Sequence, residues 1–291
     1  MDSPYLFDGP AVISFSGGRT SGYMLASILA ANGGTLPEDI TVVFANTGRE
    51  RLETLDFVRD VQGYWGVPIH WVEYRKPEKR GSIRHEEVDY ESASRDGEPY
   101  TSLIESRNFL PNPVMRFCTT ELKVNTMKDF IHHGMGWGRY TNVVGLRADE
   151  MNRVTKMQSK NDDPKNKDVW RSIAPMATAG HVLADVTDFW KQQEFDLQLR
   201  PHEGNCDLCF LKGAGTLSAI IREHPELSHW WEKQEARNVR GRDAGEGQDA
   251  SRFRNDRPSY AALAEGVRNQ SAFDFGVFDD LMTCDTNACT D

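Results

Sequence analysis

Short apolar segments alternate with amphipathic segments three times in the first 75 residues, and this order constrains the fold more than any other feature. The apolar runs at residues 12–15, 40–45 and 69–74 are typical of strands that are buried on both faces. The segments between them, 21–31 and 52–65, carry apolar side chains at helical spacing. Strands and helices in this order form right-handed βαβ crossovers. The sequence therefore predicts an α/β protein with an open, mostly parallel, doubly wound sheet.

The rest of the chain divides into a continuation of this sheet and a helical region. We expect a helix at 124–133 and a strand at 141–146, whereas the polar segments 76–100 and 152–167 are expected to be loops, the first of them an insertion. Further helices are predicted at 185–194, 214–224, 226–237 and 259–267. The predicted units are a nucleotide-binding α/β core over 1–175 and a helical, cysteine-bearing region over 176–291.

Charge and composition exclude several classes of protein. A formal net charge of −10 disfavours broad binding of nucleic acids, so a nucleic-acid acceptor has no support from composition. The first residues lack the segments of a signal peptide, and no apolar run is long enough to span a membrane, so we expect a cytoplasmic protein without a membrane partner. An odd number of cysteines, five, favours metal binding or thiol chemistry over a disulfide framework.

A glycine-containing loop follows the first predicted strand and precedes the first predicted helix. Its sequence is Ser16-Gly17-Gly18-Arg19-Thr20-Ser21. Glycines allow a tight turn, and the N–H groups of such a loop and of the helix N-terminus attract an anion. The alternative is a plain turn in which Thr20 or Ser21 caps the helix. The spacing matches neither the P-loop nor the dinucleotide-binding glycine pattern.

Three later segments contain side chains that suit a nucleotide with a phosphate or sulfate group. They are Asn46-Thr47-Gly48, then Arg116, Cys118 and Lys123, and finally Gly145-Leu146-Arg147 with Arg153. Arginine and lysine supply fixed positive charge for oxyanions. Because the first segment follows the predicted strand at 40–45, it is expected at the carboxyl edge of the sheet, where open α/β sheets bind ligands.

These segments and the glycine loop, taken in order over residues 11–155, resemble the motifs of the phosphoadenosine phosphosulfate (PAPS) reductase family. This family belongs to the PP-loop ATP pyrophosphatases, which have an adenine nucleotide alpha hydrolase-like fold. The resemblance implies an enzyme that binds ATP, PAPS or adenosine phosphosulfate through the residues of the four motifs, with Mg²⁺ as a candidate ion and Arg147 also in catalysis. Thr20 stands where most members carry Asp, so ATP and a sulfonucleotide both remain candidate substrates.

The cysteines occur in three places: Cys118, the C-x-x-C pair Cys206 and Cys209, and the tail residues Cys284 and Cys289. One such pair is an incomplete metal site, since zinc and cubane clusters normally take four ligands, and zinc or a redox dithiol are alternatives on spacing alone. The resemblance implies a [4Fe–4S] cluster on Cys118, Cys206, Cys209 and Cys284. It also implies a mobile nucleophile at Cys289, although the roles of the two tail residues can be reversed. In some members of the superfamily three cysteines bind the cluster and leave one iron open, and three ligands here fit that pattern as well.

We therefore expect an enzyme that couples nucleotide binding to sulfur chemistry. The leading reaction cleaves ATP between its α and β phosphates, adenylates an acceptor and transfers sulfur to it. The alternative is thiol-dependent reduction of PAPS or adenosine phosphosulfate to sulfite, and a different class would be a zinc-stabilised nucleotide-binding module without catalysis. The expected partners are an adenine nucleotide and a sulfur donor or thiol reductant protein, and an oligomer is compatible with the sequence.

Overall fold

The structure is a computed structural model that describes residues 3–79, 81–237 and 251–269. Within these residues it contains a six-stranded sheet with the order β4-β3-β2-β1-β5-β6. The strands are β1 (Ala11–Phe15), β2 (Ile40–Asn46), β3 (Ile69–Tyr74), β4 (His85–Val88), β5 (Tyr140–Val144) and β6 (Trp170–Ile173). Only β4 is antiparallel to its neighbour in this sheet. The predicted open, mostly parallel α/β sheet is confirmed.

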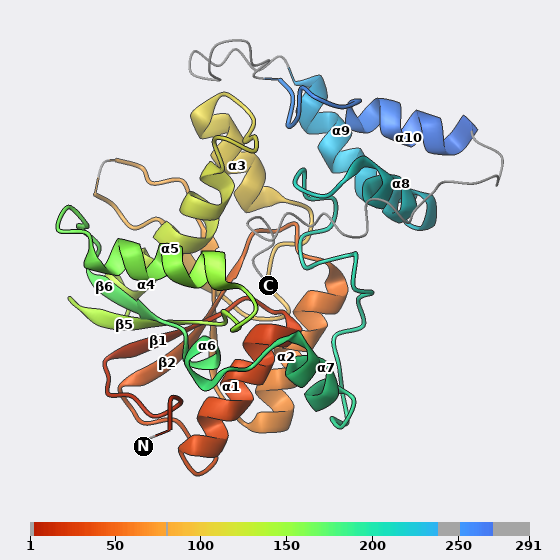
Figure 1. The fold of residues 1–291 in the computed structure, drawn as a ribbon. Helices are drawn as coiled ribbons and strands as arrows, with labels where there is room; N and C mark the ends of the chain where they lie inside the picture. Colours follow the sequence, from red (N-terminus) through yellow and green to blue (C-terminus); the bar gives the residue numbers. More distant parts are fainter. Residues whose placement is uncertain (1–2, 80, 238–250, 270–291) are drawn as a thin grey trace.

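Helices cover both faces of the sheet (Figure 1). The α-helices are α1 (Arg19–Ala31), α2 (Leu52–Trp65), α3 (Glu98–Arg107), α4 (Thr126–His133), α5 (Met151–Asp162), α6 (Pro175–Ala179), α7 (Leu183–Trp190), α8 (Ala214–Glu223), α9 (Ser228–Ala236) and α10 (Tyr260–Asn269). A π-helix, η1 (Thr119–Asn125), precedes α4, and a 3₁₀-helix, η2 (Pro225–Leu227), precedes α9. Apolar residues of α1, α2 and α7 form the core on one face, and Phe130 and Ile131 of α4 cover the other.

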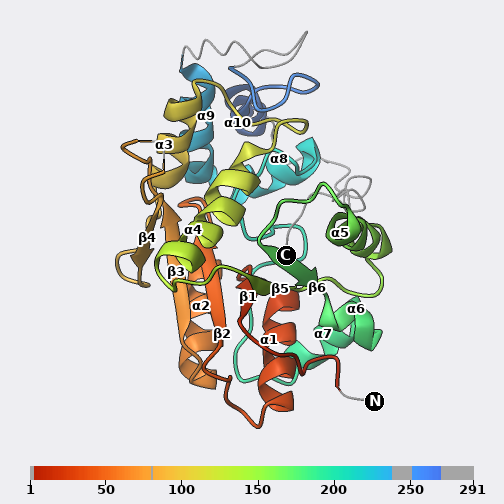
Figure 2. The same ribbon diagram turned by 90° about the vertical axis from the view of Figure 1, so that its left-hand side faces the viewer.

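A second group of helices, α3, α8, α9 and α10, lies beyond one end of the sheet (Figures 1 and 2). Tyr100 of α3 and Trp231 of α9 belong to the separate hydrophobic core of this group. Apolar contacts connect the two predicted units. Trp190 and Leu199, which follow residue 175, belong to the core of the sheet, and Tyr100, which precedes it, belongs to the core of the second group of helices. The division into units at residues 1–175 and 176–291 stays a prediction. No helix among the described residues is long and apolar enough to cross a membrane.

Two segments that the sequence predicts as loops contain regular structure. Most of 152–167 forms α5, whose single buried side chain is Val154, so the apolar stripe is too narrow to stand out in a polar segment. The segment 76–100 contains β4 and the start of α3. β4 is a short edge strand of sequence HEEV, and neither it nor β6, which no sequence pattern predicted, has the apolar run of a central strand.

Candidate functional site

The loop between β1 and α1 makes a tight turn around the side chain of Ser21. Gly17 has a φ of +77°, and a Cβ there would lie 2.7 Å from a methyl group of α2. Ser21 Oγ accepts hydrogen bonds from the N–H groups of Ser16 at 3.2 Å and Gly18 at 3.3 Å. Gly145, just after β5, approaches the same turn so closely that a Cβ would lie 3.3 Å from Ser21 Cα. The structure thus brings together the first and last of the predicted nucleotide-binding motifs.

The side chains of Arg19 and Thr20 make different contacts. Thr20 Oγ1 accepts a hydrogen bond from Arg147 Nη1 at 3.1 Å, which holds an arginine beside the loop. Arg19 Nε donates to Asp196 at 2.7 Å, and the Arg19 carbonyl accepts a hydrogen bond from Trp190 at 2.8 Å. The guanidinium of Arg19 is therefore committed to the segment after α7, and its backbone N–H is what it can offer to a ligand of the loop.

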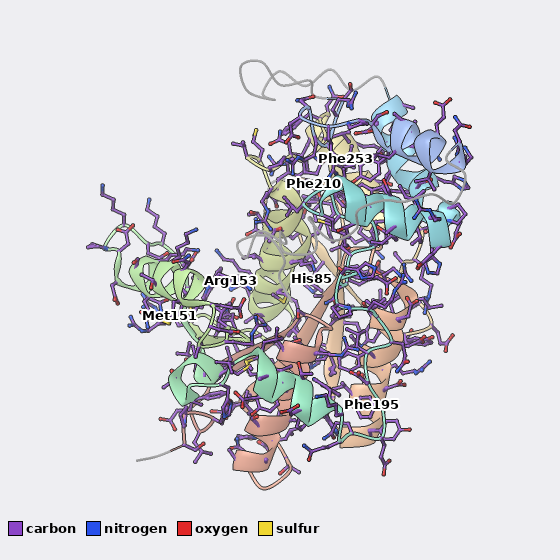
Figure 3. The ribbon with its side chains drawn as sticks, turned by 45° about the vertical axis from the view of Figure 1, so that its right-hand side comes forward. His85, Met151, Arg153, Phe195, Phe210 and Phe253 are labelled. Atoms are coloured by element: carbon purple, nitrogen blue, oxygen red, sulfur yellow. The ribbon has the colours of Figure 1, made fainter. Side chains whose placement is uncertain are left out.

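A cavity of about 190 Å³ opens beside the glycine loop, on the face of the sheet that α4 partly covers. Its lining is largely apolar and includes Tyr140 and Trp170, whose rings are stacked with centroids 5.7 Å apart. Lys123 and Arg153 also line it, and Arg153 extends from α5 while its neighbour Met151 is exposed (Figure 3). Flat aromatic walls and cationic side chains suit a nucleobase and an attached anionic group.

The Asn46-Thr47-Gly48 segment lies at the end of β2, where it shapes a turn. Asn46 is fully buried, and its Nδ2 donates to Glu73 at 2.7 Å. Thr47 Oγ1 donates to Glu50 Oε1 at 3.1 Å. Gly48 has a φ of +77°, and a Cβ there would lie 2.8 Å from a proline side chain of α3. The contacts of this motif support the backbone that carries Glu50.

Cys118, Cys206 and Cys209 line one cavity of about 60 Å³, below the second group of helices. A hydrogen bond from Cys206 to Cys209 lowers the pKa of Cys209 to about 6 against the effect of burial, and Lys212 adds to this. Burial raises the pKa of Cys118. The structure therefore gathers the three described cysteines from two distant segments. Cys284 and Cys289 lie outside the described residues.

The loop that carries Cys206 is attached to the segment after β2. Cys206 forms an antiparallel bridge with Glu50, and the N–H of Asp207 donates to the Arg49 carbonyl at 3.0 Å. Arg49 and Asp207 also form a buried ion pair, and Trp231 Nε1 donates to Asp207 at 2.9 Å. The cysteine loop is thus held to the carboxyl edge of the sheet by backbone and side-chain contacts.

Lys123 separates the two cavities and lines both of them. It lies on the π-helix η1, which begins directly after Cys118, and π-helical turns are frequent at functional sites. Its Nζ lies 3.2 Å from Glu50 Oε1, and the Glu50 side chain is fully buried. Burial alone would lower the pKa of Lys123, but Glu50 and Cys206 outweigh it and raise this pKa, so the side chain is a cation at neutral pH.

Three thiols line the cysteine cavity, and sulfur ligands suit both a zinc ion and an iron–sulfur cluster. Either group normally takes four ligands, so the described residues supply three of them. Tyr100 Oη is directed at the Cys118 sulfur without a well-aligned hydrogen bond.

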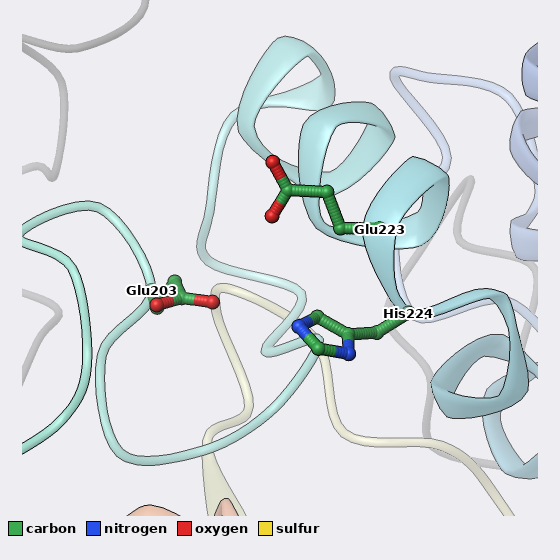
Figure 4. A group of neighbouring side chains, drawn as sticks. All are labelled: Glu203, Glu223 and His224. Carbon is green, nitrogen blue, oxygen red and sulfur yellow. The ribbon is translucent and has the colours of Figure 1, made fainter.

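Glu203, Glu223 and His224 form a different group of metal-capable side chains (Figure 4). Arg200 forms ion pairs with both glutamates, and Arg51 lies 3.6 Å from Glu203 and 3.3 Å from His224. Two guanidinium groups already supply the positive charge that a metal ion would bring. We interpret this group as a salt-bridge network that joins α8 to the cysteine loop.

The residues that connect the predicted motifs are not among the site residues that the sequence predicts. Glu50 lies two residues after Gly48, and Asn205 directly precedes Cys206, so both lie next to motifs that the sequence did single out. Lys212 is 4% exposed and donates to the Asp207 carbonyl at 3.0 Å. Their proximity to the motifs was the available signal, but Lys123, the partner of Glu50, and Ser16, the partner of Asn205, lie far away in the sequence.

Fold and site together define an α/β protein with a glycine loop beside a cysteine-lined cavity. The chain is 30% identical over 220 residues to the uncharacterized nin region protein ORF290 of Escherichia phage lambda, over 74% of this chain and 71% of that protein. It belongs to the same family as this phage protein.

Other comparisons give more distant similarities. The chain is 27% identical over 249 residues to the uncharacterized protein MJ0066 of Methanocaldococcus jannaschii, over 82% of this chain and 44% of that protein, and so spans less than half of its length. No model of a known protein family matches the chain. A solved structure of PAPS reductase from Candida auris, in a phosphate complex, is similar with 17% identity over 65% of this chain and 79% of that chain, at a TM-score of 0.39.

Proposed function

We propose that this chain is an enzyme that binds an adenine nucleotide at the glycine loop and performs sulfur chemistry at the cysteine cavity. The observation that carries this proposal is the position of Lys123, which lines both cavities and is paired with Glu50. A nucleotide in the larger cavity and a sulfur-containing group in the smaller one would lie on either side of one ammonium group. The motifs that resemble the PAPS reductase family support the same combination.

The nucleotide would be bound by apolar and charged groups at different ends of its cavity. The base would lie against the aromatic side chains of Tyr140 and Trp170. The phosphate or sulfate group would take hydrogen bonds from the N–H groups at the start of α1, with positive charge from Arg147, Arg153 and Lys123. Arg147 is already hydrogen-bonded to Thr20, so it needs little movement to reach an anion there.

Cys118, Cys206 and Cys209 would hold a [4Fe–4S] cluster, with Cys284 as the fourth ligand. Such a cluster, when bound, supplies electrons or an iron site for a sulfur atom. The chain itself supplies the three thiolates and places the cations of Lys123 and Lys212 near them, which offsets their negative charge.

The leading reaction is cleavage of ATP between the α and β phosphates, followed by transfer of sulfur to the adenylated acceptor. Arg147, Arg153 and Lys123 would stabilise the charge that develops on the departing pyrophosphate. One observation favours the alternative, reduction of PAPS or adenosine phosphosulfate to sulfite through Cys289. Thr20 replaces the usual aspartate, and it offers no carboxylate to the Mg²⁺ that accompanies ATP.

The test begins with protein purified without oxygen and analysed for iron, sulfide and zinc. Iron and sulfide in equal amounts support the cluster, whereas zinc alone contradicts it. The same protein is then given ATP and Mg²⁺, with pyrophosphate measured, or PAPS and a dithiol, with sulfite measured. Pyrophosphate supports the leading reaction and sulfite the alternative. A zinc protein that binds nucleotide and forms neither product would be a binding module.

A further inference from the structure

One side chain joins the glycine loop to the cysteine loop directly. Asn205 is 6% exposed, and its Nδ2 donates a hydrogen bond to the carbonyl oxygen of Ser16 at 2.8 Å, although the two residues are 189 positions apart. The backbone of Asn205 is fixed as well, because its own carbonyl accepts a hydrogen bond from the Arg51 N–H at 2.7 Å. The next residue is Cys206, so this contact lies at the start of the cysteine cavity.

This hydrogen bond fixes the orientation of a peptide group in the glycine loop. The peptide between Ser16 and Gly17 is planar and trans, so its C=O and N–H point in opposite directions. Because the carbonyl points at Asn205, the Gly17 N–H points away from the cysteine loop. Gly17 has a φ of +77° and no Cβ, so its own sterics restrain this peptide little. A flipped peptide would turn an oxygen toward the position where the N–H now lies.

We propose that Asn205 is a positioning residue for anion binding at the glycine loop. By holding the Ser16 carbonyl, it keeps the Gly17 N–H available to the anionic group of the nucleotide. An anion on that N–H polarises the peptide and makes its carbonyl a better acceptor, so the bond to Asn205 and the bond to the anion strengthen each other. The inference rests on the proposed function, in which the anion is the phosphate or sulfate of an adenine nucleotide.

The experiment compares the affinities of the full chain for AMP and for adenosine by calorimetry. The ratio of the two affinities reports the contribution of the phosphate. The variants are Asn205→Ala and Asn205→Asp. The aspartate keeps the shape of the side chain but replaces the hydrogen-bond donor by a carboxylate oxygen. Asn32→Ala is the matched control, since Asn32 Nδ2 also donates to a backbone carbonyl at 2.8 Å, at the opposite end of α1.

The wild-type chain is expected to bind AMP more tightly than adenosine. Asn205→Ala lowers the affinity for AMP by roughly three- to tenfold and leaves that for adenosine unchanged, the effect of one buried hydrogen bond. Asn205→Asp lowers it further, because its charge repels both the Ser16 carbonyl and the phosphate. Asn32→Ala leaves the ratio unchanged even where it lowers the thermal midpoint.

Two results overturn this inference alone. In one, Asn205→Ala keeps the wild-type ratio of affinities. In the other, Asn205→Ala and Asn205→Asp lower the affinity for adenosine as much as the affinity for AMP, which indicates a general effect on the fold. A wild-type chain that binds neither AMP nor ATP contradicts the proposed function itself, and the inference fails with it.

Discussion

The ion pair between half-buried Lys123 and fully buried Glu50 is the residue-scale feature on which the site depends. Glu50 has a fully buried side chain, and among the described residues its Oε2 has no hydrogen-bond partner. Lys123→Met would leave this carboxylate buried without a counter-charge, so we expect the free energy of unfolding to fall by about 3 kcal/mol. Urea denaturation measures this loss. The double variant Lys123→Met, Glu50→Gln should recover part of it, and a loss below about 1 kcal/mol would show that the pair is weak.

The close contact of the glycine loop with α2 can be tested with two glycines of similar conformation. Gly17 and Gly33 have φ values of +77° and +73°, but only at Gly17 would a Cβ lie 2.7 Å from Thr54 Cγ2, since at Gly33 nothing lies within 4 Å. Gly33→Ala should cost about 1 kcal/mol from backbone strain alone. Gly17→Ala should cost at least about 1 kcal/mol more and weaken AMP binding, as measured by thermal unfolding and calorimetry. If both variants lose the same free energy of unfolding, the glycine loop shifts at little cost to accommodate the added Cβ.

The contacts of Asp129 indicate how the free energy of unfolding depends on pH in the acid range. Its Oδ2 accepts a hydrogen bond from the Arg84 N–H at 2.8 Å and lies 2.7 Å from His85 Nδ1, and Oδ1 lies 3.2 Å from His133 Nδ1. Burial would raise the pKa of Asp129, but these contacts outweigh it and lower the pKa. Unfolded Asp has a pKa of about 3.9. The stabilising effect is therefore present above that pH and is lost as the pH falls through the lower folded value.

Asp129→Asn should remove this dependence. When the pH of the assay is lowered from about 5 to about 3, the free energy of unfolding of the wild type should fall more steeply than that of the variant. The measurement is a series of denaturant midpoints for both proteins in the same buffers. Parallel curves would show that other carboxyl groups control the acid transition.

At the scale of elements, the segment 191–199 after α7 is held to the N-terminus of α1 by Arg19. The Arg19 guanidinium binds Asp196 and the carbonyls of Leu197 and Leu199. Arg19→Met should therefore lower the free energy of unfolding by about 1 kcal/mol, because both charges are partly exposed, and leave AMP affinity within about twofold of wild type. Calorimetry on the folded variant decides this. A large loss of AMP affinity would return Arg19 to the nucleotide site.

Elements with a wide apolar face could be predicted from the sequence, and narrow ones could not. The bounds of α2 and β3 match the prediction, since both carry several buried apolar residues. α5 has one buried side chain, Val154, and the sequence of this segment predicts a loop. β6 lies at the sheet edge, where the side chain of Asn161 bonds both Ser172 N and Ser172 O in place of a neighbouring strand. Where a side chain, and not another strand, pairs with the backbone of an edge strand, the sequence of that strand shows no periodic apolar pattern.

At the scale of the whole molecule, the order of the motifs predicted which segments meet, but not what holds them together. Ser16, Gly145 and Leu146 line the larger cavity, and the three described cysteines line the smaller one. The connections between them are hydrogen bonds and ion pairs across long sequence separations, such as those from Asn205 to Ser16 and from Arg49 to Asp207. A single sequence shows the types of these residues but not their pairing.

The cysteine cavity borders the hydrophobic core of the second group of helices, and this gives a test of the bound group that needs no enzyme assay. Cys118 precedes η1, and Cys206 and Cys209 belong to the loop that leads into α8. A group bound by all three would tie these segments together, and its binding free energy would add to that of folding. Removing it with a chelator should lower the thermal midpoint of anaerobically purified protein by roughly 5–10 °C.

Cys118→Ser separates this effect from a general action of the chelator. The variant lacks one of the three ligands, so its midpoint should already be low, and the chelator should lower it no further. Iron, sulfide and zinc are measured on the same samples, because the loss of stability must follow the loss of metal. If the loaded and stripped wild-type proteins unfold at the same temperature, the cysteines bind nothing that supports the fold. A chelator effect of equal size in Cys118→Ser would place the metal elsewhere in the chain.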